Sequence, residues 1–406
     1  MQHMLITLND ARTLILSGQC LLDKDKNSVV QVVSDLSGIQ YDPCPILHLN
    51  HYLALWSRVP GFKVTDYDRI AYDERKLVEA NLFKRNLFTV PTRELDVYNT
   101  ATERIVRWGK SREQDKFERQ SNELLAEEEK IRHAFYEMHS CTKYQLWEYL
   151  GLTKEWDAYT ESRRQGLLNN FLPIFQVFFN MRMTNDIVVC NRLPGTFREP
   201  EFALKEDLLK DKFSAAEISY VDAVETILYK LICSFGITDI THMKAITGLS
   251  TEDISMAIAS LRHKELIANI NIEGLKKTYV ATNKSLAVLQ QHKPESTNEV
   301  SLLSPMEGII RDKRWLNTFF SYSFRFEYFK KKGMKWPLSI LSKNELVGFI
   351  DCNFDRKKKK LIVKEINIQK EKAVDKVELY RTLCSLARFH EADDLIIGGE
   401  KYPDYH

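Results

Sequence analysis

The chain has few of the features that mark disulfide-rich, zinc-binding or membrane-spanning proteins. Its seven cysteines (positions 20, 44, 141, 190, 233, 352 and 384) are scattered and never form Cys-x-x-Cys, which argues against a zinc ribbon or a disulfide framework and favours a reducing compartment. The longest apolar region, residues 171–179, is far shorter than the roughly 20 residues needed to span a bilayer. The first residues contain no basic region and no cleavage site, so they do not resemble a signal peptide. We therefore expect a soluble, cytoplasmic protein without a membrane partner.

An excess of charge of one sign is also missing. The 58 Lys and Arg residues are nearly balanced by 56 Asp and Glu residues, which leaves a net charge of +2. Any argument for nucleic-acid binding must therefore rest on local basic patches. The chain does have length and apolar content, because 44% of its 406 residues are hydrophobic. That is enough for about two to four units with buried cores.

Residues 221–281 show the order of elements found in a winged helix. An amphipathic helix is closed by Gly236, a second short helix has Thr241 as a possible cap, and a third helix begins at the capping pair Ser250 and Asp253. Two strand-like runs around a Glu-Gly turn then follow at the place of the wing. The pattern predicts three helices and a hairpin.

Two looser copies of this order precede it. One occupies about residues 7–100, with a small strand at IQYDP after its first helix, and the other about residues 128–192. In the second copy we expect ESRRQGLLNNFLPIF to form a helix and MRMTNDIVVCNR to form a hairpin that turns at Asn185 and Asp186.

Alternating strands dominate the last quarter of the chain. SYSFRFEYF, PLSILS, ELVGFIDCNF and LIVKEINI are followed by the helix VELYRTLCSLARFH, which predicts a small antiparallel β-barrel or curved sheet. The predicted fold class is thus α+β, with three tandem winged-helix units and this C-terminal sheet, and residues 290–299 are the best linker. The predicted division is 1–125, 126–200, 201–295 and 296–406.

One short strand carries a pair of reactive side chains. A strand over residues 39–42 would bury Ile39 and Tyr41 and present Gln40 and Asp42 on the other face. A carboxamide beside a carboxylate can hold a water, and the carboxylate can act as a base or as a counter-charge to a cationic transition state. The alternative is purely structural, because Asp42 can form an Asx turn before Pro43.

Three ordered segments resemble the AlkZ/YcaQ family of winged-helix DNA glycosylases. The first, SGIQYDPCPILHLNHYLALWSRVPGF, is similar to the family's Gln–apolar–Asp motif followed by a His and an LWSR-like sequence. The second is LLSPMEGIIRDKRWLNTFFSYSFRFEYF and the third ELVGFIDCNFDRKKKKLIV. Departures include Glu307 at the position of the family's Asp, Phe349 at the position of its Arg, and a segment 82–94 without the EYW…H pattern of the YcaQ branch.

The resemblance implies hydrolytic removal of N-alkylated purines from duplex DNA in base excision repair, in some family members from interstrand crosslinks. Alkylation at N7 makes guanine a cationic leaving group, so Asp42 would stabilise the sugar cation and help deprotonate a water that Gln40 orients. No Schiff-base lysine stands out, which favours a monofunctional enzyme without a cofactor. His48 and His51 are spaced to share one helical face, but no third ligand accompanies them, and we predict no metal site.

Several basic residues are candidates for contact with DNA phosphates. The stretch from Arg311 to Lys335 has a net charge of +6, and Arg356 begins an RKKKK run at an apparent hairpin turn. Arg58 would either contact phosphate or help to fix Asp42. The complete predicted DNA-binding set is His51, Arg58, Lys276, Lys277, Arg311, Lys313, Arg314, Arg325, Lys330, Lys331 and Arg356.

Two other functions fit the same pattern. Most winged helices perform no chemistry, so a non-catalytic DNA-binding protein or regulator is the main alternative, and an RNA-directed or protein-assembly role is the second. The family resemblance favours the glycosylase. It would act on nucleoid-associated DNA, and nothing in the sequence requires more than a monomer.

Overall fold

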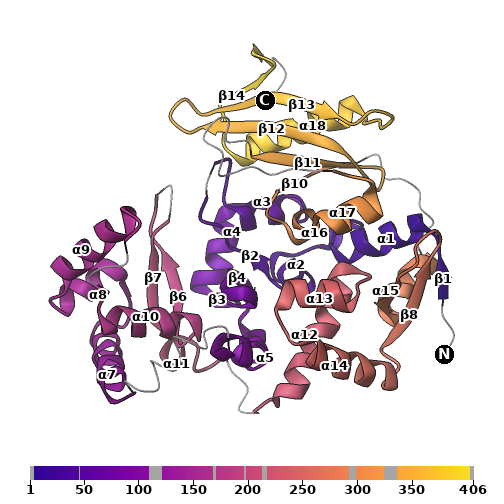
Figure 1. The fold of residues 1–406 in the computed structure, drawn as a ribbon. Helices are drawn as coiled ribbons and strands as arrows, with labels where there is room; N and C mark the ends of the chain where they lie inside the picture. Colours follow the sequence, from indigo (N-terminus) through magenta and orange to yellow (C-terminus); the bar gives the residue numbers. More distant parts are fainter. Residues whose placement is uncertain are drawn as a thin grey trace. The chain divides into compact units, whose positions relative to one another are not determined.

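The computed structural model describes residues 4–44, 46–108, 121–167, 171–195, 198–212, 217–291, 299–323 and 336–402. Its helices and strands form a mixed fold, which confirms the predicted α+β class (Figure 1). The chain divides into two compact units: unit 1 contains the described residues of 1–67, 228–243 and 254–406, and unit 2 those of 68–227 and 244–253. In the part of the chain that the structure describes, no helix is long and apolar enough to cross a membrane.

Unit 1 begins with a short strand and a well-capped helix. Thr7 and Asp10 form a reciprocal capping box at the start of α1, so the first strand ends and the helix begins at a defined residue. Leu5 lies in the strand, before the helix begins, and is 64% exposed. The elements up to residue 68 are β1 (Met4–Ile6), α1 (Leu8–Gly18), η1 (Lys24–Lys26), α2 (Val29–Asp35), β2 (Ile39–Gln40), α3 (Asn50–Trp56) and α4 (Val64–Asp68).

The order of three helices and a hairpin that residues 221–281 predict is confirmed. Ser250 caps the third helix by accepting from the Asp253 N–H at 3.0 Å, as expected. The second helix is capped by Asp239, which accepts from the His242 N–H at 3.1 Å, so the predicted cap at Thr241 is wrong. The elements are α12 (Tyr220–Phe235), α13 (Ile240–Thr247), α14 (Thr251–His263), β8 (Ile267–Ile272), β9 (Thr278–Thr282) and α15 (Asn283–Gln291).

The N-terminal strand completes the sheet of this hairpin. β1 pairs in parallel with β8, with Met4 opposite Ile270, and the resulting order is β1-β8-β9. Helix α1 meets the end of α12 backbone to backbone: a Cβ on Gly236, which has a φ of +67°, would lie 2.0 Å from the Leu14 carbonyl oxygen. Glycine is therefore required there for both its conformation and its lack of a side chain.

The last part of unit 1 is an open six-stranded sheet covered by a helix. Its order is β10-β11-β12-β13-β14-β15, and β14 joins β13 in parallel after the helix α18. β10 and β15 are edges of this sheet among the described strands, so of the two predicted forms, a barrel or a curved sheet, the barrel is not confirmed, and the parallel β13–β14 pair departs from the predicted antiparallel order. The elements are β10 (Val300–Leu303), α16 (Gly308–Arg311), α17 (Lys313–Phe320), β11 (Pro337–Ser342), β12 (Glu345–Asp355), β13 (Lys360–Ile368), α18 (Lys376–Phe389), β14 (Asp394–Ile397) and β15 (Glu400–Lys401).

Three predictions concern this region. The RKKKK run does stand at the turn between β12 and β13, where Asp355 pairs with Lys360. The strand predicted over residues 321–329 is absent at 321–323, and its remaining residues lie outside the described part of the chain. Most of the predicted linker, residues 292–298, lies outside it as well.

Unit 2 packs helices rich in aromatic residues against an antiparallel sheet. The strands within this unit have the order β4-β3-β6-β7-β5, and the rings of Trp147, Phe175 and Phe178 are fully buried. The elements are η2 (Arg69–Asp73), β3 (Leu77–Asn81), η3 (Phe83–Arg85), β4 (Leu87–Pro91), η4 (Thr92–Glu94), α5 (Leu95–Trp108), α7 (Ser121–Met138), β5 (Cys141–Thr142), α8 (Lys143–Tyr149), α9 (Thr153–Arg164), α10 (Pro173–Met183), β6 (Ile187–Arg192), β7 (Pro200–Leu204) and α11 (Lys205–Leu208).

Two predictions for this unit are wrong. The helix expected over residues 161–175 is interrupted, because α9 ends at Arg164 and α10 starts at Pro173, where proline suits the first turn of a helix. The hairpin expected over residues 181–192 does not form either. Its first residues end α10, and β6 pairs with β7 instead, with Ile187 opposite Leu204.

Candidate active site

The strand with the paired polar residues has the predicted alternation. Ile39 and Tyr41 are 5% and 4% exposed, whereas Gln40 and Asp42 are half-buried on the other side. The strand itself, β2, covers only Ile39 and Gln40, which is shorter than predicted. The two polar side chains still point away from the core, where a ligand can reach them.

Helix α3 supports this segment from inside the protein. The His51 ring stacks on Tyr41 with 4.7 Å between the ring centroids and an interplanar angle of 25°, and His51 is 0% exposed. The Asn50 side-chain amide donates to the backbone carbonyl oxygen of Gln40 at 2.8 Å. His51 therefore does not lie at a surface that DNA could contact. It fixes the middle residue of the motif instead.

One side-chain oxygen of Asp42 and the side-chain oxygen of Gln40 each accept a hydrogen bond within the protein. The Cys44 N–H donates to Asp42 Oδ1 at 2.9 Å, which is the Asx turn that we considered as the structural alternative. Arg311 Nη1 donates to Gln40 Oε1. Desolvation lowers the pKa of Arg311, and the negative charge of Asp42 acts in the opposite direction. A carboxylate, a carboxamide and a guanidinium thus meet at one place.

Arg58 lies in the interior of unit 1. It is 1% exposed, and its guanidinium donates to Glu307 Oε2 at 2.5 Å, to the Gln19 carbonyl at 2.7 Å and to Ser57 Oγ at 2.8 Å. Glu307 is also buried, and its Oε1 accepts from the Ser304 N–H at 2.8 Å. A phosphate contact by Arg58 would require this network to open, so the geometry does not support its predicted role in DNA binding.

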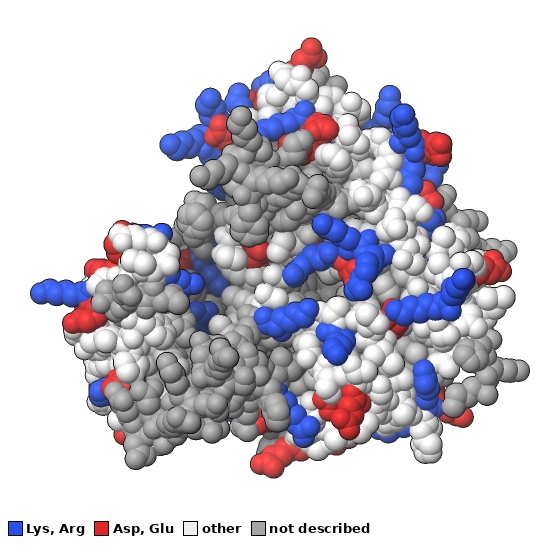
Figure 2. Space-filling view, viewed as in Figure 1, with Lys and Arg blue, Asp and Glu red and all other residues white. Residues whose placement is uncertain are grey.

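The other described basic residues of the predicted set are exposed. Lys313 and Arg314 project from α17, Lys276 and Lys277 from the turn between β8 and β9, and Arg356 from the turn after β12. Figure 2 shows Lys and Arg side chains gathered over α16 and α17. The remaining three residues of the set, Arg325, Lys330 and Lys331, lie outside the described part of the chain.

A buried histidine joins α13 to α17 beneath these cations. His242 stacks on Trp315 at 4.1 Å and 12°, and burial lowers the pKa of His242 to about 4. Asp239 beside it forms an ion pair with Lys277 at 2.8 Å, and Asp312 lies 3.8 Å from Arg314. Lys277 of the β8–β9 turn and Arg314 of α17 are thus both paired with acids that lie beside this stacked pair, and the helix α16 before α17 ends at Arg311.

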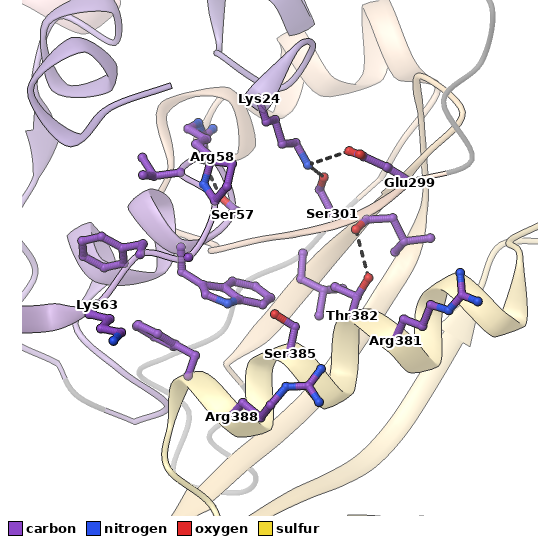
Figure 3. A pocket seen from close by; sticks show the side chains of 18 of the residues that line it. Lys24, Ser57, Arg58, Lys63, Glu299, Ser301, Arg381, Thr382, Ser385 and Arg388 are labelled. Atoms are coloured by element: carbon purple, nitrogen blue, oxygen red, sulfur yellow. Dashed lines mark hydrogen bonds and ion pairs between the residues drawn. The ribbon is translucent and has the colours of Figure 1, made fainter. Parts of the chain in front are cut away.

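Sequence reasoning missed a cavity of about 710 Å³ in unit 1. Figure 3 shows α18 forming one wall with Thr382 and Ser385, across from Lys24 and Ser301. Lys24 Nζ donates to Ser301 Oγ at 2.6 Å. The walls come from segments far apart in sequence, so no local pattern could reveal the cavity. Gln40 and Asp42 are not among the residues that line it.

No metal ligands come together among the described residues, where no group of three or more His, Cys, Asp or Glu side chains could hold a metal ion. His48 and His51 do not share a helical face, because α3 begins only at Asn50. His48 packs instead against Tyr52 and Phe389, with ring centroids 5.1 and 5.3 Å away.

Comparisons with known proteins identify the family of the chain and a similar fold. The sequence profile of a family described as DNA glycosylase AlkZ-like matches residues 33–389. Among solved structures, the chain is similar to a Streptomyces sahachiroi DNA glycosylase, AlkZ, with a TM-score of 0.67 and 13% identity over 97% of this chain and 99% of that one. At this identity the likeness concerns the fold. No curated protein matches the chain.

Proposed function

Because the chain belongs to the AlkZ-like DNA glycosylase family, we propose that it is a monofunctional enzyme that hydrolyses the N-glycosidic bond of N7-alkylated purines in duplex DNA. The observation that carries the proposal is the pair of half-buried side chains, Gln40 and Asp42, presented side by side on a segment anchored by the buried Tyr41. The reaction would serve base excision repair.

The chemistry needs only one carboxylate. An N7-alkylated purine is cationic and leaves with the electrons of the glycosidic bond, so the enzyme has to stabilise positive charge on the sugar and place a water. Asp42 would supply the counter-charge and accept a proton from the water, and Gln40 would orient that water. A site presented at the surface also suits bulky lesions, which do not fit a closed pocket, and so the same residues would release a purine from an interstrand crosslink.

DNA would be held by phosphate contacts from exposed cations. We assign these contacts to Lys276, Lys277, Lys313, Arg314 and Arg356, with Arg325, Lys330 and Lys331 as further candidates. In this proposal His51 and Arg58 support the site from within. Three winged-helix units, within the four-part division at residues 125, 200 and 295, would form the platform. The protein would act as a monomer on nucleoid DNA in the cytoplasm.

A non-catalytic DNA-binding protein remains the second candidate, because the Asx turn between Asp42 and Cys44 gives Asp42 a structural role that requires no chemistry. Asp42→Asn separates the two functions, since an asparagine oxygen can accept the same N–H bond while the charge is lost.

The test is base release from duplex DNA that contains N7-methylguanine, followed as abasic sites under single-turnover conditions. We expect Asp42→Asn to lower the rate by about 10²-fold or more with DNA affinity retained, and Gln40→Ala to be slower than wild type as well. The same comparison on a nitrogen-mustard crosslink tests unhooking. Tight binding without release of either lesion by the wild type would instead identify a non-catalytic DNA binder.

A further inference from the structure

The amide of Gln40 has a defined orientation. A guanidinium has only donors and no acceptor, so the atom of Gln40 that faces Arg311 Nη1 must be the carbonyl oxygen, Oε1. The amino group, Nε2, is then the part of the side chain that remains for a ligand. If Gln40 were turned the other way, two donors would face each other.

We propose that Arg311 is a positioning residue: it fixes the Gln40 amide so that Nε2 donates to the attacking water while Asp42 accepts from it. This inference rests on the proposed glycosylase function. The water oxygen forms a bond to C1′ of the sugar, the bond from C1′ to the base nitrogen breaks, and its electron pair neutralises the cationic base. The proton of the water passes to the Asp42 carboxylate and then to solvent.

A water held in this way needs one donor and one acceptor. Asp42 carries the acceptor, and its Oδ1 already receives the Cys44 N–H at 2.9 Å, which limits how the carboxylate can turn. Gln40 supplies the donor when its amino group, and not its oxygen, faces the water. Arg311 occupies that oxygen, and the Arg311 charge also lies close enough to Asp42 for the two to interact.

The position of Arg311 depends on a short turn. Helix α16 contains only Gly308–Arg311, and a helix of one turn is not stable by itself. The Glu307 carbonyl accepts from the N–H groups of Ile310 and Arg311, both at 3.0 Å. The Glu307 side chain in turn bonds to Ser304 within the same segment and to Arg58 at the end of α3.

Arg58 connects this turn to the helix that supports the motif. Its guanidinium is hydrogen-bonded to Glu307 and also to the carbonyls of Gln19 and Ala54, at 2.7 and 3.1 Å. The buried pair of Arg58 and Glu307 therefore fixes α16 relative to α1 and α3. Through α16 it fixes Arg311, and through Arg311 the amide of Gln40.

Arg311→Met tests whether Arg311 orients the Gln40 amide, with Arg311→Lys as the conservative variant. The readouts are the single-turnover rate of base release at saturating enzyme and, separately, the dissociation constant for lesion-containing DNA as a function of salt. We expect Arg311→Met to lower the saturated rate by about 10²-fold, the loss that a misplacement of about 1 Å causes, and Arg311→Lys to restore part of it through its remaining donors. The salt dependence of binding stays that of the wild type.

Two matched arginines serve as controls. Arg314→Met, three residues away and exposed, should weaken binding and lower the slope of log K against log salt by about 0.9, as expected for one lost phosphate contact. Arg381→Met, on α18 in an exposed ion pair with Glu378, should change neither rate nor binding. If Arg311→Met behaves like Arg314→Met, with weaker binding and an unchanged saturated rate, Arg311 is a phosphate contact and the inference is overturned.

A second comparison, of Glu307→Gln with Glu79→Gln, tests whether the buried pair of Arg58 and Glu307 positions Arg311. Glu79 forms an equally buried pair with Arg192 in unit 2. We expect both variants to be less stable, but only Glu307→Gln should lower the saturated rate per folded molecule, by about 10-fold or more. Equal rates in the two variants would contradict this step. A wild type that releases no base would overturn the proposed function and this inference together. If the wild type is active and Arg311→Met and Arg311→Lys have the same saturated rate as the wild type, the inference alone is overturned.

Discussion

Within the described residues, each unit contains one buried pair of an arginine and a glutamate, and the two pairs have different surroundings. In unit 2, Arg192 binds both oxygens of Glu79, at 2.8 and 2.6 Å, and the Tyr72 hydroxyl donates to the same carboxylate at 2.7 Å. In unit 1, Arg58 binds Glu307 through one oxygen at 2.5 Å. Both pairs are at most 5% exposed, so burial does not distinguish them.

The difference lies in what each pair connects. Glu79 lies on β3 and Arg192 on β6, two strands that are already neighbours in the sheet. Arg58 and Glu307 come from segments without such pairing, 249 residues apart in sequence. The first pair adds to a contact that the sheet already makes, whereas the second holds a one-turn helix in place. Equal burial therefore does not imply an equal role.

The largest effect that separates the two pairs should come from removing one charge. Glu79→Gln and Glu307→Gln each leave an arginine without its counter-charge in the interior, which lowers the free energy of unfolding by about 3–5 kcal/mol. We expect Glu79→Gln to be the more costly, because it weakens two contacts with Arg192 and one with Tyr72. Urea denaturation of both variants measures the difference. A loss below 1 kcal/mol for either (the range of exposed pairs) would show that the pair is not buried in solution.

The sequence predicted the elements of unit 1 better than its long-range contacts. The helices after residue 220, which belong partly to unit 2, were placed well because Gly236 and the capping residue Ser250 mark two of their ends. The alternation of residues 39–42 correctly separated buried from accessible side chains. The burial of Arg58 could not be predicted, because its partner Glu307 is distant in sequence. Glu307 itself had been noted only as a departure from the family pattern.

Unit 2 was harder to predict, for a local reason. Residues 171–179 are apolar except for Gln176, so periodicity could not show where one helix ends and the next begins. In unit 1, alternation likewise predicted strands but not closure of the sheet, since closure depends on the tilt and register of strands that sequence does not specify. The orientation of Gln40 required the position of Arg311, a residue that the sequence had assigned to DNA binding.

A smaller effect should separate two glycines in the same backbone conformation. Gly236 of unit 1 has a φ of +67° and Gly151 of unit 2 a φ of +70°, but an added Cβ would meet the Leu14 carbonyl in the first case and nothing within 4 Å in the second. Gly151→Ala should lower stability by about 1–2 kcal/mol, the strain of the left-handed conformation, and Gly236→Ala by more than that. Thermal unfolding compares them. Equal shifts in Tm would indicate that α1 can move away from α12 without loss.

The last comparison concerns acid. Burial lowers the pKa of His242 to about 4 and that of His390 well below its usual value, and both lie in unit 1. Between about pH 6.5 and 4 the unfolded chain binds more protons than the folded one, so stability present above pH 6.5 is lost as the pH falls, by up to about 1.4 kcal/mol per pH unit for each histidine. In unit 2, His133 and His139 are exposed.

Hydrogen exchange at pH 6.5 and 5 measures this contrast directly. Protection in α13 should fall more than in α7, and His242→Phe, which keeps the stacking on Trp315, should reduce the loss in α13. An equal fall in both helices, unchanged in His242→Phe, would assign the acid sensitivity to other groups.

The pairing of β1 with β8 also sets an order of events for the nascent chain. All of unit 2 precedes residue 254, whereas Met4 must wait for Ile270 and Gln40 for Arg311. At about 5–20 residues per second of synthesis, unit 2 can be complete while the partners of the N-terminal segment have yet to leave the ribosome. The groups proposed to break the glycosidic bond are therefore assembled late, and a prematurely terminated chain that ends before residue 307 contains the motif without the residues that orient it.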